Sequence, residues 1–228
     1  MKFHVLQHHP CEGLGLIKDW ITQKNAAIST TLFYNIDYIK PNIEEIDALI
    51  IMGGPMNVND EDLFPWLIEE KNLIREAIRK NKKILGVCLG AQLIVNSMGG
   101  TVKSNMCKEI GFFPINAEHS YNCFKFPENL NVVHWHGQTF DLPYKSILLA
   151  TSVACKNQAF QINSNIIGLQ FHLEFDAAAL QSLILESSGE LVPSKYVQSE
   201  KKLQGISKKE FKEMKKILFK LLDYLFNK

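Results

Sequence analysis

The sequence predicts an α/β protein with an open, mostly parallel central sheet, helices on both faces of the sheet and some antiparallel strands. Two patterns in the 228 residues lead to this fold class. Short apolar runs alternate with helical patterns over the first hundred residues, which is typical of βαβ units. The runs are almost continuously apolar, as expected for strands that are covered on both faces.

Seven apolar runs are the expected strands. They cover residues 3–6, 31–34, 48–52, 84–87, 132–135, 147–150 and 166–171. The first four alternate with helical segments, so we expect them to be parallel. The segment 101–170 is richer in strand patterns, so we expect the antiparallel strands there.

Four segments have the spacing of amphipathic helices. They cover residues 14–23, 62–80, 89–98 and 207–227. The second places Leu67, Ile74 and Ala77 at helical spacing, and the third ends at a Gly-Gly pair. We expect the last helix to pack on the sheet with its lysines in solvent; binding to a membrane surface or a partner is the alternative. The polar residues 185–204 are expected to form a surface connection or a short helical excursion.

The length of the chain favours a single domain, residues 1–228, that includes the C-terminal helix. A formal net charge of +1 gives no basis for nucleic-acid binding. No apolar run approaches the roughly 18 residues of a membrane span, and the N-terminus does not resemble a secretory signal. We therefore expect a cytoplasmic protein that binds neither nucleic acid nor membrane. Its five irregularly spaced cysteines argue against a disulfide framework.

Residues capable of chemistry follow three of the expected strands. Gly53 and Gly54 come directly after the third apolar run, Cys88 after the fourth and His172 after the seventh. In open α/β sheets, ligands bind beyond the carboxyl ends of the strands. We therefore expect these residues to converge at one edge of the sheet.

Cys88 lies in the stretch Gly-Val-Cys-Leu-Gly at residues 86–90, between an expected strand and an expected helix. This G-x-C-x-G pattern is the cysteine counterpart of the nucleophile elbow of hydrolases. The positive end of the following helix favours the thiolate, and backbone N–H groups at the turn can bind a developing oxyanion. We interpret Cys88 as a nucleophile, although a buried core cysteine is the commoner case.

His172 and Glu174 are two residues apart, so on an extended segment they project to the same face. The carboxylate can then hold the imidazole in the tautomer that accepts the thiol proton. An isolated His-x-Glu is usually a surface pair. Its position at the end of an apolar strand, like that of Cys88, favours a catalytic interpretation.

The sequence does not reveal a metal site among the remaining histidines. His134 and His136 could present two imidazoles on one face of a strand, but no third ligand is evident. We therefore expect no metal and no cofactor. His8 and His9, at the end of the first strand, are expected to be structural or to line the rim of a substrate site.

Three motifs resemble those of class I glutamine amidotransferases. They are Gly-Gly-Pro at residues 53–55, Gly-Val-Cys-Leu-Gly-Ala-Gln at 86–92 and Gly-Leu-Gln-Phe-His-Leu-Glu at 168–174. Further stretches at 52–56, 108–111, 134–137 and 157–160 resemble the stand-alone, GMP synthase-like members of this family. We expect no ATP-pyrophosphatase domain of true GMP synthetase within the 228 residues. The resemblance implies the flavodoxin-like fold of the family.

The resemblance also implies a catalytic triad of Cys88, His172 and Glu174 that cleaves the side-chain amide of glutamine. The backbone N–H groups of Gly54 and Leu89 would stabilise the oxyanion.

Four further positions would contact or surround the substrate by resemblance: Gly53, Gln92, Glu109 and His136. Gln138 stands where relatives commonly carry Asp. The missing carboxylate would alter recognition of the substrate amino group or a contact with a lid.

Three functions are compatible with these residues. The first is glutamine hydrolysis, with ammonia passed to a separate synthetase. The second is a free-standing hydrolase of γ-glutamyl peptides that uses the same triad. The third is a regulatory protein without activity on the same scaffold. The complete triad favours an enzyme acting on glutamine or a γ-glutamyl compound.

Overall fold

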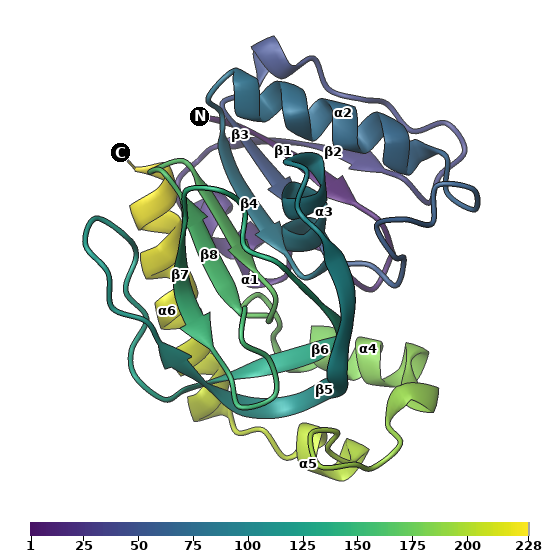
Figure 1. The fold of residues 1–228 in the computed structure, drawn as a ribbon, viewed down its shortest axis with the longest axis vertical. Coiled ribbons are helices and arrows are strands. Elements are labelled where there is room, and N and C mark those ends of the chain that lie inside the picture. Colours follow the sequence, from purple (N-terminus) through teal and green to yellow (C-terminus); the bar gives the residue numbers. More distant parts are fainter. Residues whose placement is uncertain (228) are drawn as a thin grey trace.

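The computed structural model describes residues 1–227, which form a nine-stranded sheet in the order β2-β1-β3-β4-β9-β8-β7-β5-β6 (Figure 1). The strands are β1 (Lys2–Gln7), β2 (Ala27–Leu32), β3 (Ala48–Ile51), β4 (Lys83–Val87), β5 (Val102–Ala117), β6 (Leu130–Phe140), β7 (Ser146–Thr151), β8 (Ala159–Ile162) and β9 (Ile166–Leu169). The five strands from β2 to β9 in this order are parallel, and the remaining pairings are antiparallel. The predicted combination of a parallel region followed by antiparallel strands is confirmed.

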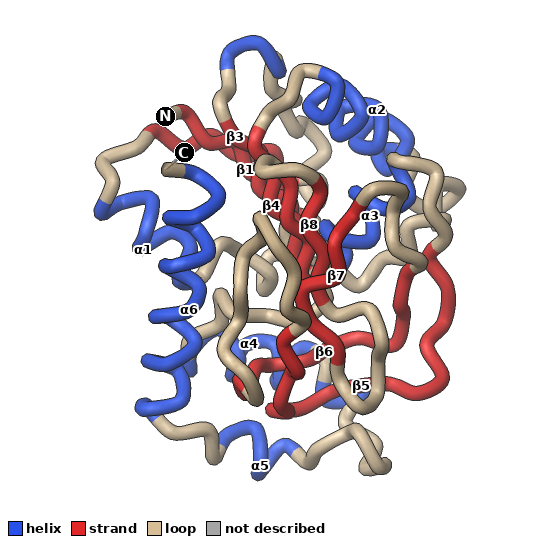
Figure 2. The backbone as a smooth tube through the Cα atoms, turned by 60° about the vertical axis from the view of Figure 1, so that its left-hand side comes forward, coloured by secondary structure: helices blue, strands red, loops and turns tan. Residues whose placement is uncertain are grey.

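Helices cover both faces of the sheet (Figure 2). The helices are α1 (Leu16–Gln23), α2 (Trp66–Arg79), α3 (Leu89–Ser97), α4 (Ala177–Glu186), α5 (Glu200–Gln204) and α6 (Lys208–Phe226), with 3-10 turns η1 (Ile43–Glu45) and η2 (Ser188–Glu190). Helices α1 and α6 pack together on one face, and α2 and α3 pack together on the other. Two apolar clusters therefore form, one on each side of the parallel strands.

The helix α6 lies within the predicted segment 207–227. Ser207 caps its first turn in a capping box with Glu210. The residues that face the protein are apolar and almost fully buried, among them Met214, Leu218 and Leu221. None of the helices that the structure describes is long and apolar enough to cross a membrane.

The prediction for β2 was wrong in position. We expected a strand at residues 31–34, whereas β2 covers Ala27–Leu32 and its first four residues are exposed. This strand is at the edge of the sheet and pairs only with β1. An edge strand with one open face does not need an apolar run, so the hydrophobic pattern did not reveal it.

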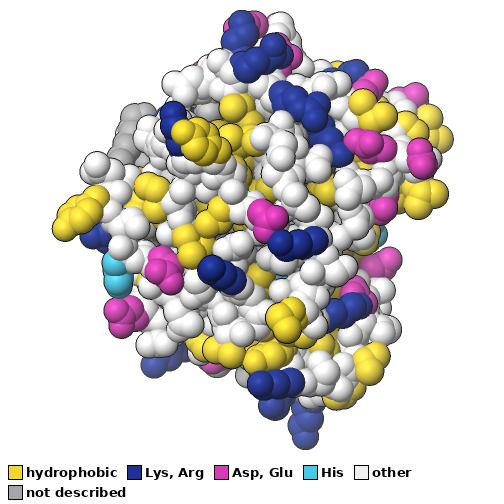
Figure 3. All heavy atoms as spheres, in the orientation of Figure 1, with side chains coloured by type: hydrophobic (Ala, Val, Ile, Leu, Met, Phe, Trp, Pro, Cys, Tyr) yellow, Lys and Arg dark blue, Asp and Glu magenta, His cyan; other side chains and the backbone are white. Residues whose placement is uncertain are grey.

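The surface carries charges of both signs. Figure 3 shows Lys and Arg side chains interspersed with Asp and Glu side chains over the face that it presents, and no large area of a single sign. This distribution agrees with the formal net charge of +1.

Candidate active site

Cys88 lies directly after β4, in a backbone conformation that is unusual for a residue with a side chain. Its φ is 52° and its ψ is −108°, and it is the N-cap residue of α3. A Cβ atom on Gly86 would lie 2.7 Å from the carbonyl oxygen of Gly90, and a Cβ atom on Gly90 would lie 2.1 Å from the Ile51 carbonyl oxygen. The two glycines therefore allow the close strand and helix packing that a nucleophile elbow requires.

His172 lies three residues after β9, the parallel neighbour of β4 in the sheet. Its backbone N–H donates to the Val133 carbonyl oxygen at 2.8 Å, which ties the segment to β6. Its Nδ1 lies 2.6 Å from Glu174 Oε1, and both side chains are buried. The ring also stacks on Phe175, with the ring centroids 4.5 Å apart. The expected placement of His172 and Glu174 on one face is therefore observed.

The electrostatics at His172 favour the imidazolium. Burial alone would lower the pKa of this side chain, but the Glu174 carboxylate and the neighbouring Cys88 raise it well above its usual value. Gln170 adds a donor to the sulfur, since its Nε2 lies 3.6 Å from Cys88 Sγ. Gln92 Nε2 in turn donates to Gln170 Oε1 at 3.0 Å.

A hydrogen bond from His8 fixes the Gly53–Gly54 peptide. The Nδ1 of His8 donates to the Gly53 carbonyl oxygen at 3.0 Å, and its Nε2 lies 2.8 Å from Glu70 Oε1. Burial lowers the pKa of His8, but Glu70 outweighs burial and raises it. The raised pKa favours the protonated ring, in which both nitrogens can donate. Trp66 stacks on the ring, with the ring centroids 5.6 Å apart.

A cavity of about 300 Å³ opens at the edge of the sheet where β4 and β9 end. Its walls include Gly54, Cys88, Gln92, His136, Gln138 and His172. Three carboxyl side chains, those of Glu12, Asp60 and Glu190, also line it, and no Lys or Arg does so among the residues described. A larger hollow of about 920 Å³ lies along α2, but it contains neither Cys88 nor His172.

Glu12 is a further acidic residue close to the catalytic candidates. Its side chain is buried, and a Cβ atom on Gly53 would lie 2.0 Å from Glu12 Oε2 and 3.5 Å from His172 Cε1. Burial raises the pKa of the Glu12 carboxyl, although His172 and His8 partly offset this effect. Position 53 therefore requires glycine, because any side chain there would overlap the Glu12 carboxylate. No local pattern pointed to Glu12, because the residues that it meets at the site are distant along the chain.

Two of the residues expected around the substrate lie behind the cavity wall. Gly53 faces His8 and Glu12, and Glu109 is 1% exposed and absent from the cavity lining. Gly54 and Leu89, the expected oxyanion donors, lie against each other, and their backbone N–H groups make no hydrogen bond within residues 1–227.

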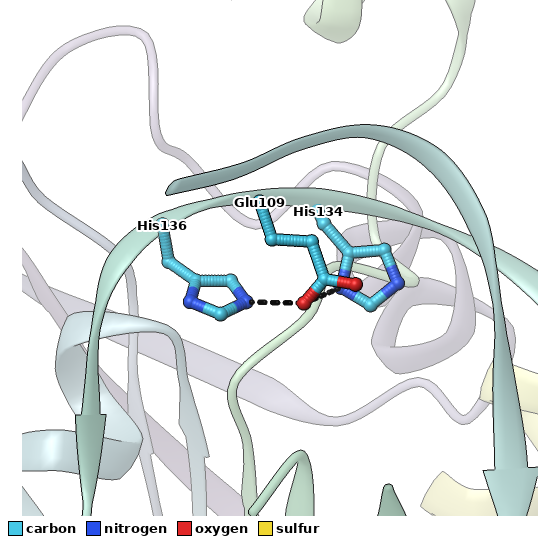
Figure 4. Close-up of side chains that lie close together, drawn as sticks. All are labelled: Glu109, His134 and His136. Atoms are coloured by element: carbon cyan, nitrogen blue, oxygen red, sulfur yellow. Dashed lines mark ion pairs between the residues drawn. The ribbon is translucent and has the colours of Figure 1, made fainter. Parts of the chain in front are cut away.

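Glu109 lies between two imidazoles on one face of the β5–β6 ribbon (Figure 4). Its Oε2 is 3.3 Å from His136 Nε2 and 3.6 Å from His134 Nδ1. All three side chains are buried, and their ligand-type atoms lie within 4.8 Å of one another. The sequence did not reveal a third ligand-type side chain beside His134 and His136. In the structure this side chain is Glu109, which lies opposite His136 in the β5–β6 register.

The profile of the class-I glutamine amidotransferase family matches residues 17–192 of the chain. The glutamine amidotransferase-like protein YfeJ of Salmonella typhimurium is 28% identical over 232 residues, which cover 99% of this chain and 97% of that protein. A chain of the glutamine-hydrolysing GMP synthase of Picrophilus torridus is 29% identical over 181 residues, 76% of this chain and 89% of that one. Gamma-glutamyl peptidase 4 of Arabidopsis thaliana is 27% identical over 154 residues, 63% of this chain and 59% of that protein.

Solved structures agree with the sequence relatives. The crystal structure of a glutamine amidotransferase from Thermotoga maritima matches with a TM-score of 0.90 at 30% identity, over 99% of this chain and 97% of that one. The match of the family profile to most of the chain, together with this structural likeness, shows that the chain belongs to the class-I glutamine amidotransferase family.

Proposed function

We propose that the protein hydrolyses the side-chain amide of glutamine, with Cys88 as nucleophile, His172 as general acid and base, and Glu174 as the group that orients His172. The observation that carries this proposal is the position of Cys88 in a strained turn next to the His172 imidazole, which a buried carboxylate holds. A strained turn that exposes a nucleophile beside an oriented base is the arrangement that covalent catalysis requires.

The proposed reaction proceeds through a thioester. Cys88 Sγ attacks the amide carbon, and the carbonyl oxygen becomes an oxyanion. His172 gives its proton to the nitrogen, the C–N bond breaks and ammonia leaves. Water then attacks the thioester carbon as His172 takes its proton, and glutamate leaves while the Cys88 thiolate is restored.

The backbone N–H groups of Gly54 and Leu89 are the proposed oxyanion donors. Both groups lack a partner elsewhere in residues 1–227 and both belong to segments that adjoin Cys88. Donors that are already oriented stabilise the developing charge without a reorganisation cost.

Gln92 and His136 are the proposed substrate contacts, and Glu12 favours an ammonium group in the cavity. The cavity has three carboxyl groups and no basic residue among the described lining residues. Lys108 Nζ already pairs with Glu190 at 2.9 Å, and Asp60 accepts from the Asn57 N–H at 2.7 Å. Glu12 therefore remains to meet the α-ammonium group that glutamine and γ-glutamyl peptides share.

A second candidate function is the hydrolysis of γ-glutamyl peptides without a partner. Similarity to gamma-glutamyl peptidase 4 and the presence of Gln138 in the cavity wall favour it. Similarity to a chain of a glutamine-hydrolysing GMP synthase favours the first function and a separate synthetase that accepts the ammonia. Both functions use the same thioester chemistry.

Glutamate release from glutamine and from γ-glutamyl peptides tests these proposals. We expect the chain alone to hydrolyse glutamine slowly, with a kcat below about 1 s⁻¹, whereas the median kcat of enzymes is about 10 s⁻¹. His172→Ala should lower turnover by roughly 10²–10⁴-fold, and Glu174→Gln should have a smaller effect. A peptide cleaved much faster than glutamine, without stimulation by cell extract, would replace the first function with the second.

Labelling with a glutamine-mimicking alkylator identifies the nucleophile. We expect mass spectrometry to find the label at Cys88 and Cys88→Ala to be inactive. Cys123→Ala is a matched control, since Cys123 is 8% exposed and Cys88 is 7% exposed. Loss of activity with the label on another cysteine would refute the assignment, and a chain that neither reacts nor hydrolyses any substrate would favour a regulatory protein.

A further inference from the structure

Glu109 and His134 have no role in the proposed reaction, and His136, which lies with them in one cluster, is a proposed substrate contact only. Glu109 and His134 are buried behind the cavity wall, and only His136 reaches the cavity. Glu109 lies opposite His136 in the β5–β6 register, and His134 is two residues along the same face of β6. Two neighbouring strands therefore fix the positions of all three side chains.

Hydrogen bonds satisfy only some of the polar atoms of this cluster. His136 Nδ1 donates to the Gln138 carbonyl oxygen at 2.9 Å, so a neutral His136 would direct its Nε2 lone pair at Glu109 Oε2, 3.3 Å away. Gln158 Nε2 lies 2.6 Å from Glu109 Oε2 and 3.4 Å from His136 Nε2, so its N–H groups relieve only part of the repulsion between the two lone pairs, and a cation between them would relieve the rest. A proton or a metal ion can supply that cation.

His134 is the observation that distinguishes these possibilities. Its side chain is completely buried, and neither of its ring nitrogens makes a well-formed hydrogen bond in the part of the chain that the structure describes, although the Phe113 backbone lies close enough to raise the pKa of the ring. Its Nδ1 lies 3.6 Å from Glu109 Oε2, which is too far for a hydrogen bond. A proton shared by Glu109 and His136 would leave His134 without a well-formed bond, whereas a metal ion would use its lone pair.

We propose that Glu109, His134 and His136 bind a divalent transition-metal ion of the zinc type. Two imidazoles and one carboxylate form a common ligand set for such ions. Bonds of about 2.05 Å in a tetrahedral site place neighbouring ligand atoms about 3.3 Å apart. The separations of 3.3 and 3.6 Å around Glu109 Oε2 are close to that value.

The surrounding residues match the outer shell of such a site. The hydrogen bond from His136 Nδ1 to the Gln138 carbonyl leaves Nε2 free for the ion. Ser152 Oγ and Gln158 Nε2 donate to Glu109 Oε2 at 3.0 and 2.6 Å, which orients the carboxylate. Among the described residues, only these three side chains form the cluster, so a water molecule would complete a four-coordinate site.

The ion would be structural. It would hold β5 to β6 behind the cavity and fix the ring of His136 in the wall. Metal-free protein should therefore retain glutamine hydrolysis at temperatures well below its Tm. Failure of this proposal leaves the proposed thioester chemistry untouched.

Metal binding is best measured in Cys88→Ser protein without an affinity tag, because a thiolate next to His172 could itself bind zinc. After treatment with a chelator, the protein is titrated with Zn²⁺ by calorimetry and with Co²⁺ by visible absorption. We expect one ion per chain, a four-coordinate Co²⁺ spectrum and a Tm increase of roughly 5 °C when the ion is 100-fold above its Kd.

His134→Ala and Glu109→Gln should lower the affinity for the ion by at least about 10-fold, whereas His119→Ala should leave it unchanged. His119 is the control because it is also paired with a glutamate, Glu128, but on the surface. Absence of stoichiometric binding, or equal binding in wild type and Glu109→Gln, would overturn the proposal. If His134→Ala fails to fold, the Glu109→Gln titration and the Co²⁺ spectrum of the parent decide the matter.

Discussion

His8 fixes the direction of the Gly54 backbone N–H through a hydrogen bond to the Gly53 carbonyl oxygen. The peptide between Gly53 and Gly54 is trans and planar, so its C=O and N–H groups point in opposite directions. His8 holds the C=O end, and Glu70 holds His8. The imidazole therefore directs the Gly54 N–H toward the side of the cavity.

This arrangement predicts a positioning role for His8. His8→Gln should lower kcat by about 10–100-fold and change KM little, because the Gly54 N–H is the proposed oxyanion donor and such a donor acts mainly in the transition state. Steady-state kinetics of glutamate release measure both constants, with His119→Gln as the surface control. An increase in KM at constant kcat would contradict the role, since it would indicate a ground-state substrate contact.

Single residues near strand ends were predictable, whereas partners from distant segments were not. Cys88 and His172 follow buried strands, and Glu174 follows His172 by two, so local patterns were enough to propose them as site residues. Glu70 meets His8 across 62 residues and from the middle of α2, where a glutamate looks like an ordinary surface residue. No short-range signal distinguishes it.

The packing of α3 on β3 depends on the absence of a side chain at Gly90. A Cβ atom there would lie 2.1 Å from the Ile51 carbonyl oxygen, and this atom belongs to the backbone of a buried strand. The contact also positions the start of α3, and therefore the turn at Cys88.

Gly90→Ala should destabilise the fold by about 2 kcal/mol or more, because the strand and the helix must separate. Urea unfolding measures this change. Gly189→Ala is the matched control, since a Cβ atom at Gly189 meets nothing within 4 Å. Equal stability of both variants would show that α3 can shift without cost.

Strands with continuous apolar runs and helices with amphipathic spacing were predicted well, and elements without either pattern were not. β3, β4 and β9 are buried along almost their whole length and coincide with predicted runs. β5 extends over sixteen residues, many of them exposed, and β2 is a polar edge strand. The helix α4 buries only Leu180, Leu183 and Ile184 and was not predicted.

The stability of the whole chain should depend on pH through His4. Its Nδ1 and Nε2 lie 2.7 and 2.9 Å from the hydroxyls of Ser29 and Thr31, between β1 and β2. Burial lowers the pKa of His4 to about 4 from a usual value of 6.5. His4 therefore takes up a proton below pH 6.5 in the unfolded chain but only near pH 4 in the folded chain. Because the unfolded chain binds this proton more tightly, the free energy of unfolding decreases as the pH falls from 6.5 to 4.

We expect this group to remove at most about 2 kcal/mol of the free energy of unfolding between pH 7 and pH 5. Urea unfolding of wild type and His4→Gln at both pH values gives the comparison, since glutamine can keep the hydrogen bonds but does not titrate. A wild-type decrease no larger than that of His4→Gln would mean that His4 accepts its proton in the folded state.

The position of β9 between β4 and β8 has a consequence for biosynthesis. β4 is complete at residue 87, but its parallel neighbour β9 begins at residue 166. At a translation rate of about 5–20 residues per second, the nascent chain waits roughly 4–16 s for this strand. During that interval β4 has an unpaired apolar edge, which chaperones would have to shield from other chains. A ribosome that stalls in this interval leaves a chain that carries Cys88 but not His172, so the proposed nucleophile is made long before its proposed base.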